Sequence, residues 1–258
     1  MNVEQHSWIK KMPLPIRVSV CSSVVLFALF FFPHSPIHAG QPERNPPAKY
    51  NQPIDVYEKR DMEGWTFLLS PQIRAKPEVL EQVLSEADRQ LKQIKIRLPA
   101  PAVKKLQEVR IWVELDNRPS CCYHPNPKWL KENNYNVDKV RDVEIGLASE
   151  FINWGKRSPV NTLLHELCHA YHHRVLGFDN PEIKAAYEEA KQSGKYDSIL
   201  RENGRKVRHY AMVDVTEYFA ELSETYFVAN DYFPFVKAEL QQFDPKMYQI
   251  IRHVWGDK

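Results

Sequence analysis

The sequence predicts an α+β domain, in which a small mixed sheet precedes a largely helical C-terminal part. Short apolar segments with strand character are concentrated before residue 150, whereas segments with helical spacing dominate after it. No internal repeat is visible. We expect residues 54–258 to form one domain, because a chain of this length can bury a core of its own.

Residues 1–39 have the organisation of a secretory signal peptide. Basic residues precede an apolar segment over 18–32, and residues 37–39 read Ile-His-Ala before a glycine, as at a cleavage site. The apolar segment is shorter than the roughly 20 residues of a membrane-spanning helix, although an uncleaved signal anchor is an alternative. We therefore expect a secreted or periplasmic protein with no stable membrane anchor after cleavage. Residues 40–53 are proline-rich and polar, which predicts a linker.

Composition narrows the possible partners and the role of the cysteines. The chain has 35 Lys and Arg against 33 Asp and Glu, so no basic surplus indicates a nucleic-acid partner.

Cys121, Cys122 and Cys168 lie outside the signal segment, and an odd number of cysteines means that at least one thiol is free or pairs outside the chain. Cys121 and Cys122 are expected to be reduced or to pair separately, with a vicinal disulfide between them as the alternative. Cys168 is expected to face the core.

Strand and helix signals alternate before the histidine-rich segment. Residues 56–57 and 65–69 flank Glu63-Gly64, which predicts two strands joined by a turn. Apolar residues at helical spacing predict an amphipathic helix over 77–96. Alternating apolar and polar residues predict a half-buried strand over 109–115. The next segments are predicted to be a loop with one helical turn over 120–134, a strand over 143–147 and a helix over 149–154.

The rest of the chain is predicted to be mainly helical. One helix is expected from about residue 159 to 176, because Gly177 follows it as a stop signal. Residues 196–212 contain Asn203-Gly204, which predicts a hairpin. Further helices are predicted over 182–192, 214–229, 235–243 and 245–255.

The most informative motif is an H-E-x-x-H in the segment NTLLHELCHAYHH, formed by His165, Glu166 and His169. Residues four apart lie on one face of a helix, so both imidazoles can reach one zinc ion at about 2.0–2.1 Å. Glu166 is then a candidate general base beside the metal. The motif predicts one Zn²⁺ per chain.

A catalytic zinc needs a third protein ligand and one open position. His173 lies about 12 Å from the first motif histidine along an unbroken helix, too far to share the ion, and it and His172 are expected to be helix-end residues. Glu217 is the preferred third ligand. Glu221, one turn later, would accept the free N–H of a zinc-bound imidazole. Glu224 is the alternative ligand.

These motifs, with Glu217-Tyr218-Phe219-Ala220-Glu221, resemble those of the gluzincin peptidases, most closely the catalytic domain of anthrax lethal factor and related proline-directed endopeptidases. The resemblance covers roughly residues 161–221 and implies a zincin-like metallopeptidase domain. It also implies that Tyr210, seven residues before the glutamate ligand, faces the metal. There it would donate its O–H to the oxyanion of the tetrahedral intermediate.

The expected activity is therefore that of a secreted zinc-dependent endopeptidase acting on a peptide or protein substrate. Glu166 would take a proton from the attacking water and later deliver it to the leaving amine. One alternative is a non-catalytic zinc-binding or interaction domain, although a purely structural site does not need a base. Another alternative is a zinc hydrolase of a non-peptide amide, such as one of the cell wall.

Overall fold

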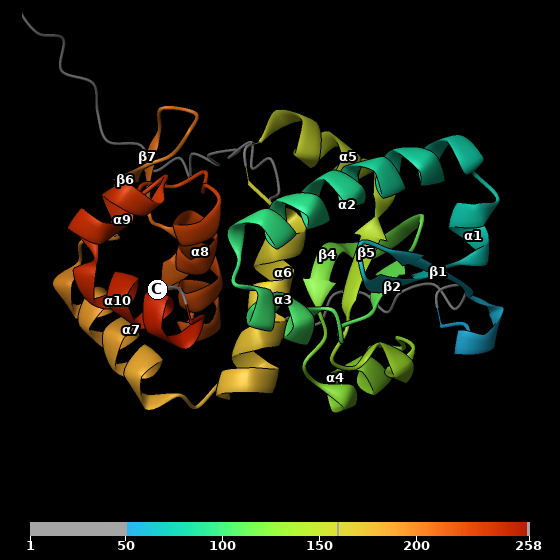
Figure 1. Cartoon of the computed structure of the whole chain (residues 1–258), viewed down its shortest axis with the longest axis horizontal. Helices are drawn as coiled ribbons and strands as arrows, with labels where there is room; N and C mark the ends of the chain where they lie inside the picture. Colours follow the sequence, from blue (N-terminus) through green and yellow to red (C-terminus); the bar gives the residue numbers. More distant parts are fainter. Residues whose placement is uncertain (1–50, 159, 257–258) are drawn as a thin grey trace, which may run out of the picture. The chain divides into compact units, whose positions relative to one another are not determined.

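The structure is a computed structural model that describes residues 51–158 and 160–256. The predicted signal peptide over 1–39, and the predicted linker apart from its last three residues, lie outside the described residues. Within them the predicted α+β class with a small mixed sheet is confirmed (Figure 1). All five strands of the main sheet lie before Ala148, where helices also occur, and the part of the chain after it is mainly helical.

The main sheet has five strands in the order β1-β2-β3-β5-β4. Its three inner strands run parallel to one another, and each outer strand is antiparallel to its neighbour. Strand β4 is therefore an edge strand, and its pairing with β5 shifts register between Asp116 and Cys121. The strands are β1 (Glu58–Met62), β2 (Trp65–Leu69), β3 (Ile111–Val113), β4 (Asp116–Tyr123) and β5 (Val143–Leu147).

The predicted hairpin around Glu63-Gly64 is confirmed, because both turn residues have positive φ angles of 55° and 95° and join β1 to β2. Its first strand was misplaced, however. Residues 54–56 form a short 3-10 helix, η2 (Ile54–Val56), and pairing begins at Glu58. The prediction of a half-buried strand over 109–115 was also wrong, because β3 lies between β2 and β5 and is buried on both faces.

Within the predicted loop over 120–134, the predicted helical turn is present as α4 (Pro127–Glu132), whereas the first residues are the end of β4 and not a loop. Cys121, Cys122 and Tyr123 are all buried, so this strand lacks the alternation of apolar and polar residues that identifies a half-exposed strand. The helix begins at Asn126, whose side chain accepts hydrogen bonds from the N–H groups of Lys128 and Trp129.

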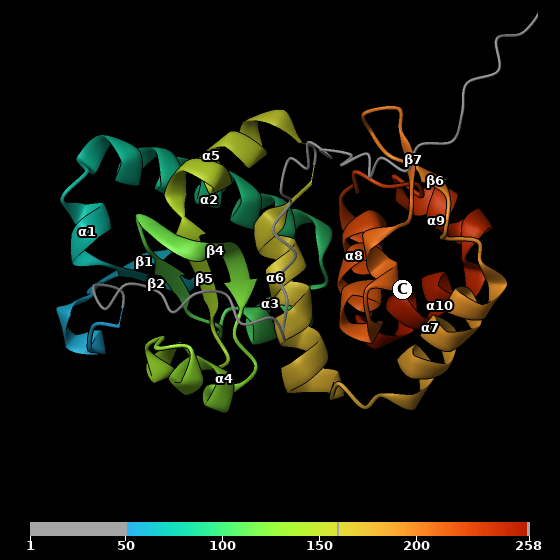
Figure 2. The same ribbon diagram turned by 180° about the vertical axis from the view of Figure 1, so that it is seen from behind.

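Helices pack on one face of the sheet and form the main core with it. The predicted helix over 77–96 is confirmed as α2 (Pro77–Arg97), and α5 (Ala148–Arg157) and α6 (Thr162–Tyr171) lie with it. In Figures 1 and 2, α2 and α5 lie on one side of the sheet and α4 on the other. The sheet residues that face this core are Trp65, Phe67, Leu69, Ile111, Val113, Cys121, Tyr123, Val143 and Ile145.

The motif helix α6 begins later than predicted, because Asn161 is its N-cap and accepts a hydrogen bond from the N–H of Leu164 at 2.8 Å. It continues as one turn of π-helix, η4 (His172–Leu176), and ends at Gly177 with a φ of 78°. The predicted C-terminal limit is thus confirmed, although the helix is not uniform. A π-helical turn is rare and often lies near a functional site.

The C-terminal part is a group of helices around α8 (Val215–Phe227), which packs against α6. The predicted helices are all present, with changes of at most two residues at their ends. The predicted hairpin over 196–212 is present but shorter, with strands at 199–200 and 206–207, and its last three residues form a 3-10 helix. Among the described helices, none combines the length and apolar character needed to cross a bilayer. The other elements are α1 (Pro71–Arg74), α3 (Ala100–Leu106), η3 (Val137–Lys139), α7 (Pro181–Ser193), β6 (Ile199–Leu200), β7 (Lys206–Val207), η5 (Tyr210–Met212), α9 (Lys237–Phe243) and α10 (Pro245–Val254).

Candidate metal centre

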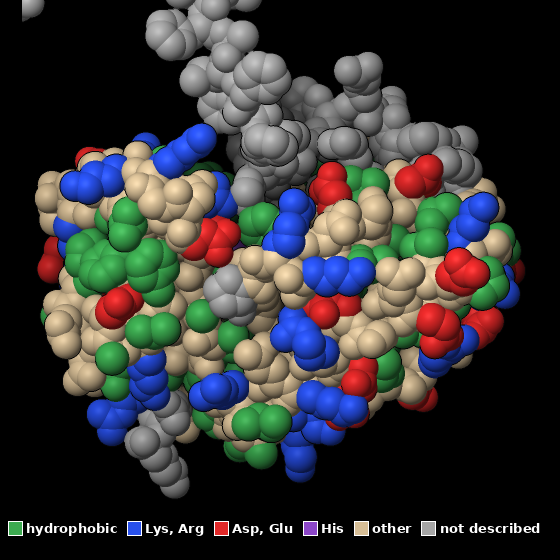
Figure 3. Space-filling model, turned by 90° about the horizontal axis from the view of Figure 1, so that it is seen from above, with side chains coloured by type: hydrophobic (Ala, Val, Ile, Leu, Met, Phe, Trp, Pro, Cys, Tyr) green, Lys and Arg blue, Asp and Glu red, His purple; other side chains and the backbone are tan. Residues whose placement is uncertain are grey.

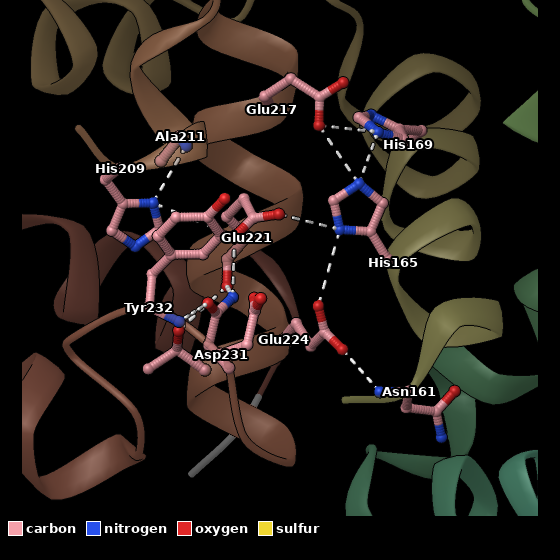
Figure 4. A network of polar contacts seen from close by, with 12 residues as sticks. Asn161, His165, His169, His209, Ala211, Glu217, Glu221, Glu224, Asp231 and Tyr232 are labelled. Carbon is pink, nitrogen blue, oxygen red and sulfur yellow. Dashed lines mark hydrogen bonds and ion pairs between the residues drawn. The ribbon is translucent and has the colours of Figure 1, made fainter. Parts of the chain in front are cut away.

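The structure brings His165 and His169 of α6 together with Glu217 of α8. The Nε2 atoms of the two histidines are 3.2 Å apart, and Oε2 of Glu217 lies 3.2 Å from the first and 3.4 Å from the second (Figure 4). All three side chains are buried. Helix geometry explains the pair of histidines, and the packing of α8 on α6 supplies the carboxylate.

The three atoms fit a metal ion. Two atoms bound to one zinc ion at 2.0–2.1 Å in a tetrahedral arrangement are about 3.3 Å apart. The three separations of 3.2, 3.2 and 3.4 Å match this edge length on every side. Two imidazole nitrogens and one carboxylate oxygen are also a donor set of known catalytic zinc sites. This buried group can therefore hold a metal ion.

Glu166 is held beside this group by strand β4. Its Oε2 accepts a hydrogen bond from the backbone N–H of Tyr123 at 2.8 Å, whereas its Oε1 has no hydrogen-bond partner among the described residues. Burial raises the pKa of the Glu166 carboxyl, while the neighbouring His165 and His169 oppose that rise. A buried carboxylate with one oxygen fixed and the other available is suited to proton transfer.

Two carboxylates support the other side of His165. Its Nδ1 lies 3.5 Å from Oε1 of Glu221 and 3.6 Å from Oε2 of Glu224, and both glutamates come from α8 (Figure 4). Glu221 is fixed by Asn230, and Glu224 accepts the backbone N–H of Asn161 at 2.6 Å. Glu221 therefore lies beside Nδ1 of His165, the position predicted for a residue that accepts the free N–H of a zinc-bound imidazole. Glu224, the alternative ligand, lies beside it and away from Nε2.

The carboxylates create a negative potential at the centre. Burial alone would lower the pKa of His165, yet hydrogen bonding to Glu217 and Glu224 raises it well above the ordinary value. Burial, together with the charge of Glu224, raises the pKa of Glu221 to about 8, although His165 opposes this. The potential that favours a proton on His165 also favours a bound cation, which is the second reason that a metal ion fits here.

The predicted Tyr210 lies at the start of η5, which packs against α8 immediately before the glutamate ligand. Its hydroxyl is buried. The preceding residue, His209, fixes this turn, because its Nδ1 accepts the N–H of Ala211 at 3.0 Å and its ring stacks on Tyr232 with centroids 4.9 Å apart. The role of Tyr210 toward a substrate stays a prediction.

The two histidines after the motif lie at the C-terminal end of α6, as predicted: His172 is its C-cap residue and His173 follows it. His172 is fully buried between Phe178 and Phe219, and burial lowers its pKa to about 3, so it is a neutral ring in the core. His173 is partly buried, and its Nδ1 lies 3.0 Å from the hydroxyl of Tyr123. Neither belongs to the group of ligand atoms, as predicted for His173.

The three cysteines are free thiols and buried, which leaves no disulfide among the described residues. Cys168 is fully buried in the main core, as predicted. Cys121 faces the same core, whereas Cys122 points to the other face of the sheet, because successive strand residues alternate. There Cys122 lies near His124 and Glu144, in a second buried group of potential metal ligands.

A lysine already supplies the cation in this second group. Nζ of Lys139 lies 2.7 Å from both Glu114 and Glu144, and all three side chains are fully buried. Nε2 of His124 is 2.6 Å from Oε2 of Glu144, a hydrogen-bond distance that is shorter than the roughly 3.3 Å between two ligands of one zinc ion. We therefore regard this group, the far-face cluster, as an internal ion network.

No family model, curated protein or solved structure matches this chain. The candidate site therefore depends on its own geometry. Three supports of the site were not predicted from the sequence: the backbone N–H of Tyr123, the side chain of Asn230 and the turn at His209. A fourth, Asn161, was also not predicted, although an asparagine four positions before the first histidine is a recognisable N-cap signal.

Proposed function

We propose that this protein is a zinc-dependent peptidase of the gluzincin type, with a zincin-like domain and a secreted or periplasmic location. The observation that carries the proposal is the triangle of ligand atoms from His165, His169 and Glu217, with the buried carboxylate of Glu166 beside it. The leader-like composition of residues 1–39 supports the location. A peptide or protein is the proposed substrate.

A zinc ion held by these three residues would polarise the scissile carbonyl and make water acidic enough to react near neutral pH. Glu166 accepts the proton of the attacking water through its available Oε1 and returns it to the leaving amine. Glu221 and Glu224 keep the ring of His165 oriented by accepting its Nδ1 proton. Tyr210 donates a hydrogen bond to the developing oxyanion.

Metal analysis tests the ligand set directly. We expect about one zinc ion per wild-type chain, and a loss of zinc affinity greater than the roughly 10- to 100-fold caused by removing a supporting group when Glu217 is replaced by alanine. Glu188→Ala, at an exposed position of α7, is the matched control and is expected to retain zinc. The measurement is elemental analysis after dialysis against a competing chelator.

The same samples separate the competing functions. Chelator-sensitive cleavage of a mixed peptide library would support the peptidase. Zinc without cleavage of any peptide would instead favour a binding domain or a hydrolase of another amide. A wild-type chain that binds no zinc would contradict the proposal outright.

Replacing Tyr210 by phenylalanine is expected to lower kcat/KM by about 10²- to 10³-fold, the effect of removing one oxyanion donor. Zinc content is expected to stay at the wild-type level, since the hydroxyl is not among the metal ligands. Tyr248→Phe, on α10, is a matched control. Steady-state hydrolysis of a fluorogenic peptide measures both variants, and an unchanged rate for Tyr210→Phe would remove this residue from the mechanism.

A further inference from the structure

His209 is the N-cap residue of η5 and directly precedes Tyr210, the proposed oxyanion donor. Its side chain is fully buried. Figure 3 views the molecule from the side on which β6 and β7 lie in Figure 1, and no histidine side chain is visible among the described atoms of that face. Because the ring of His209 is enclosed, any part it has in the reaction is exerted through its neighbours.

The ring of His209 closes a small loop around Tyr210. Its Nδ1 accepts the N–H of Ala211 at 3.0 Å, as the side-chain oxygen of a common N-cap residue would (Figure 4). The main chain of His209 is fixed as well, because its N–H donates to the carbonyl of Tyr196 at 2.9 Å and its carbonyl accepts the N–H of Met212 at 3.0 Å. One residue therefore holds the backbone on both sides of Tyr210.

Two aromatic rings hold the imidazole itself in place. Tyr232 stacks on it with centroids 4.9 Å apart and an interplanar angle of 24°, and Tyr196 contacts it edge-on with centroids 5.3 Å apart. Arg201 lies over the ring of Tyr232, 4.8 Å from its centroid, and forms an ion pair with Asp231 at 2.7 Å. The imidazole is thus packed on two sides, which fixes the position of its Nδ1.

The segment that carries Tyr232 also supports the metal centre. Nδ2 of Asn230 donates to Oε2 of Glu221 at 2.9 Å, and Oδ1 of Asn230 accepts the N–H of Tyr232 at 2.8 Å. Glu221 is the carboxylate beside Nδ1 of His165, and its Oε2 lies 3.9 Å from Nδ1 of His209 (Figure 4). One short segment therefore holds both this cap residue and the support of a ligand histidine.

Stability alone does not account for a histidine at this position. Nδ1 accepts a hydrogen bond, and burial keeps the ring neutral by lowering the pKa of His209 to about 3, so the ring proton lies on Nε2. This N–H has no hydrogen-bond partner among the described residues, and a buried donor without a partner destabilises a fold. Phenylalanine would fill the same space without that donor, but it has no atom to accept the N–H of Ala211.

We propose that His209 is a positioning residue for the proposed hydrolysis, because its Nδ1 fixes the turn at Ala211 and thereby sets where the Tyr210 hydroxyl lies relative to the metal centre. This inference rests on the proposed peptidase activity and on the predicted role of Tyr210. A misplacement of about 1 Å can lower a rate by about 10²-fold. Since His209 acts through one hydroxyl, its loss lowers the rate by no more than removal of that hydroxyl does.

Two substitutions separate the acceptor from the ring. His209→Phe keeps an aromatic ring and removes the acceptor, so kcat for a fluorogenic peptide is expected to fall at least about tenfold, up to the loss in Tyr210→Phe. It replaces one unpartnered buried N–H by another, that of Ala211, so the urea midpoint is expected to change little. His209→Asn places an amide oxygen where Nδ1 lies and removes the ring. This conservative variant is expected to recover most of the lost rate and to have a lower urea midpoint.

The rate then follows the acceptor and the stability follows the ring, a pattern that a purely structural role would not produce. A double variant tests whether His209 acts through the hydroxyl. Adding His209→Phe to Tyr210→Phe is expected to cause no further loss of kcat, because the group being positioned is already absent. Zinc content is expected to equal that of the wild type in each variant. His253→Phe, at an exposed position of α10, is the matched control and is expected to change neither rate nor stability.

A wild-type rate for His209→Phe, or a further loss of rate in the double variant, would overturn this inference and leave the peptidase intact. The inference would also fail if His209→Asn were slower than His209→Phe, since the rate would then follow stability. A wild-type chain that binds zinc and cleaves no peptide would overturn the proposed activity together with this inference. Failure of the positioning role and failure of the proposed function therefore give different results.

Discussion

Replacing Glu166 by glutamine is expected to lower kcat/KM for peptide hydrolysis by about 10²- to 10⁴-fold while the metal stays bound. Glutamine has the same shape and can still accept the N–H of Tyr123 with its amide oxygen, so the fold of the site is preserved. It cannot accept a proton from water, because its remaining group is an NH₂. The loss should therefore appear in the chemical step.

The measurement combines single-turnover hydrolysis with zinc analysis of the same preparation. Glu150→Gln, at an exposed position of α5, is the matched control and is expected to hydrolyse peptides at the wild-type rate. If Glu166→Gln cleaved as fast as the wild type, the base would have to be another residue. A purely structural zinc site would predict no change in any property except stability.

The candidate site could largely be predicted from sequence, because the spacing of residues along a helix determines which side chains lie on the same face. His165 and His169 are four residues apart and therefore share a face. Glu217 and Glu221 have the same spacing on α8, which is why one approaches Nε2 of His165 and the other Nδ1. The contact between the two helices could not be derived in this way; Glu217 was preferred because a second carboxylate, Glu221, follows it by one helical turn and could support a ligand histidine.

Strands were predicted less well, because several are buried on both faces. β3 has no exposed residue, and Cys121, Cys122 and Tyr123 of β4 are all buried, so neither strand shows the expected alternation. The backbone contact from β4 to Glu166 depends on this strand and was missed for the same reason. The far-face cluster was missed because a lysine is rarely buried, and its sequence gives no sign of the partners that make burial possible.

Replacing Lys139 by methionine is expected to lower the free energy of unfolding by about 3–5 kcal/mol. The variant leaves the buried carboxylates of Glu114 and Glu144 without the ammonium group that lies 2.7 Å from each. This is a large part of the total, since domains are stable by about 5–15 kcal/mol. Lys131→Met, at an exposed position of α4, is the control and is expected to change stability little. Urea unfolding measures both variants.

The effect should depend on pH with a definite sign. Although burial opposes it, Lys139 and His124 hold the pKa of Glu144 at about 2, below its ordinary value of 4.5. A lowered pKa stabilises the wild-type fold above pH 4.5, and this contribution is lost as pH falls from 4.5 toward 2. The pKa of Lys139 is raised above 10.5, so its contribution is present below that pH and disappears only as pH rises above it.

In Lys139→Met the carboxylates face each other without a cation, so their pKa values should rise instead of falling. As pH decreases, protonation of these carboxylates removes their repulsion and stabilises the variant. Over the same pH range the wild type loses the stabilising contribution of the Glu144 carboxylate. The difference in unfolding free energy between the two should therefore be largest near neutral pH and shrink toward pH 4. Adding Glu144→Gln to Lys139→Met removes one uncompensated charge and should restore part of the stability at neutral pH. A constant difference across this pH range would mean that Lys139 acts by packing alone.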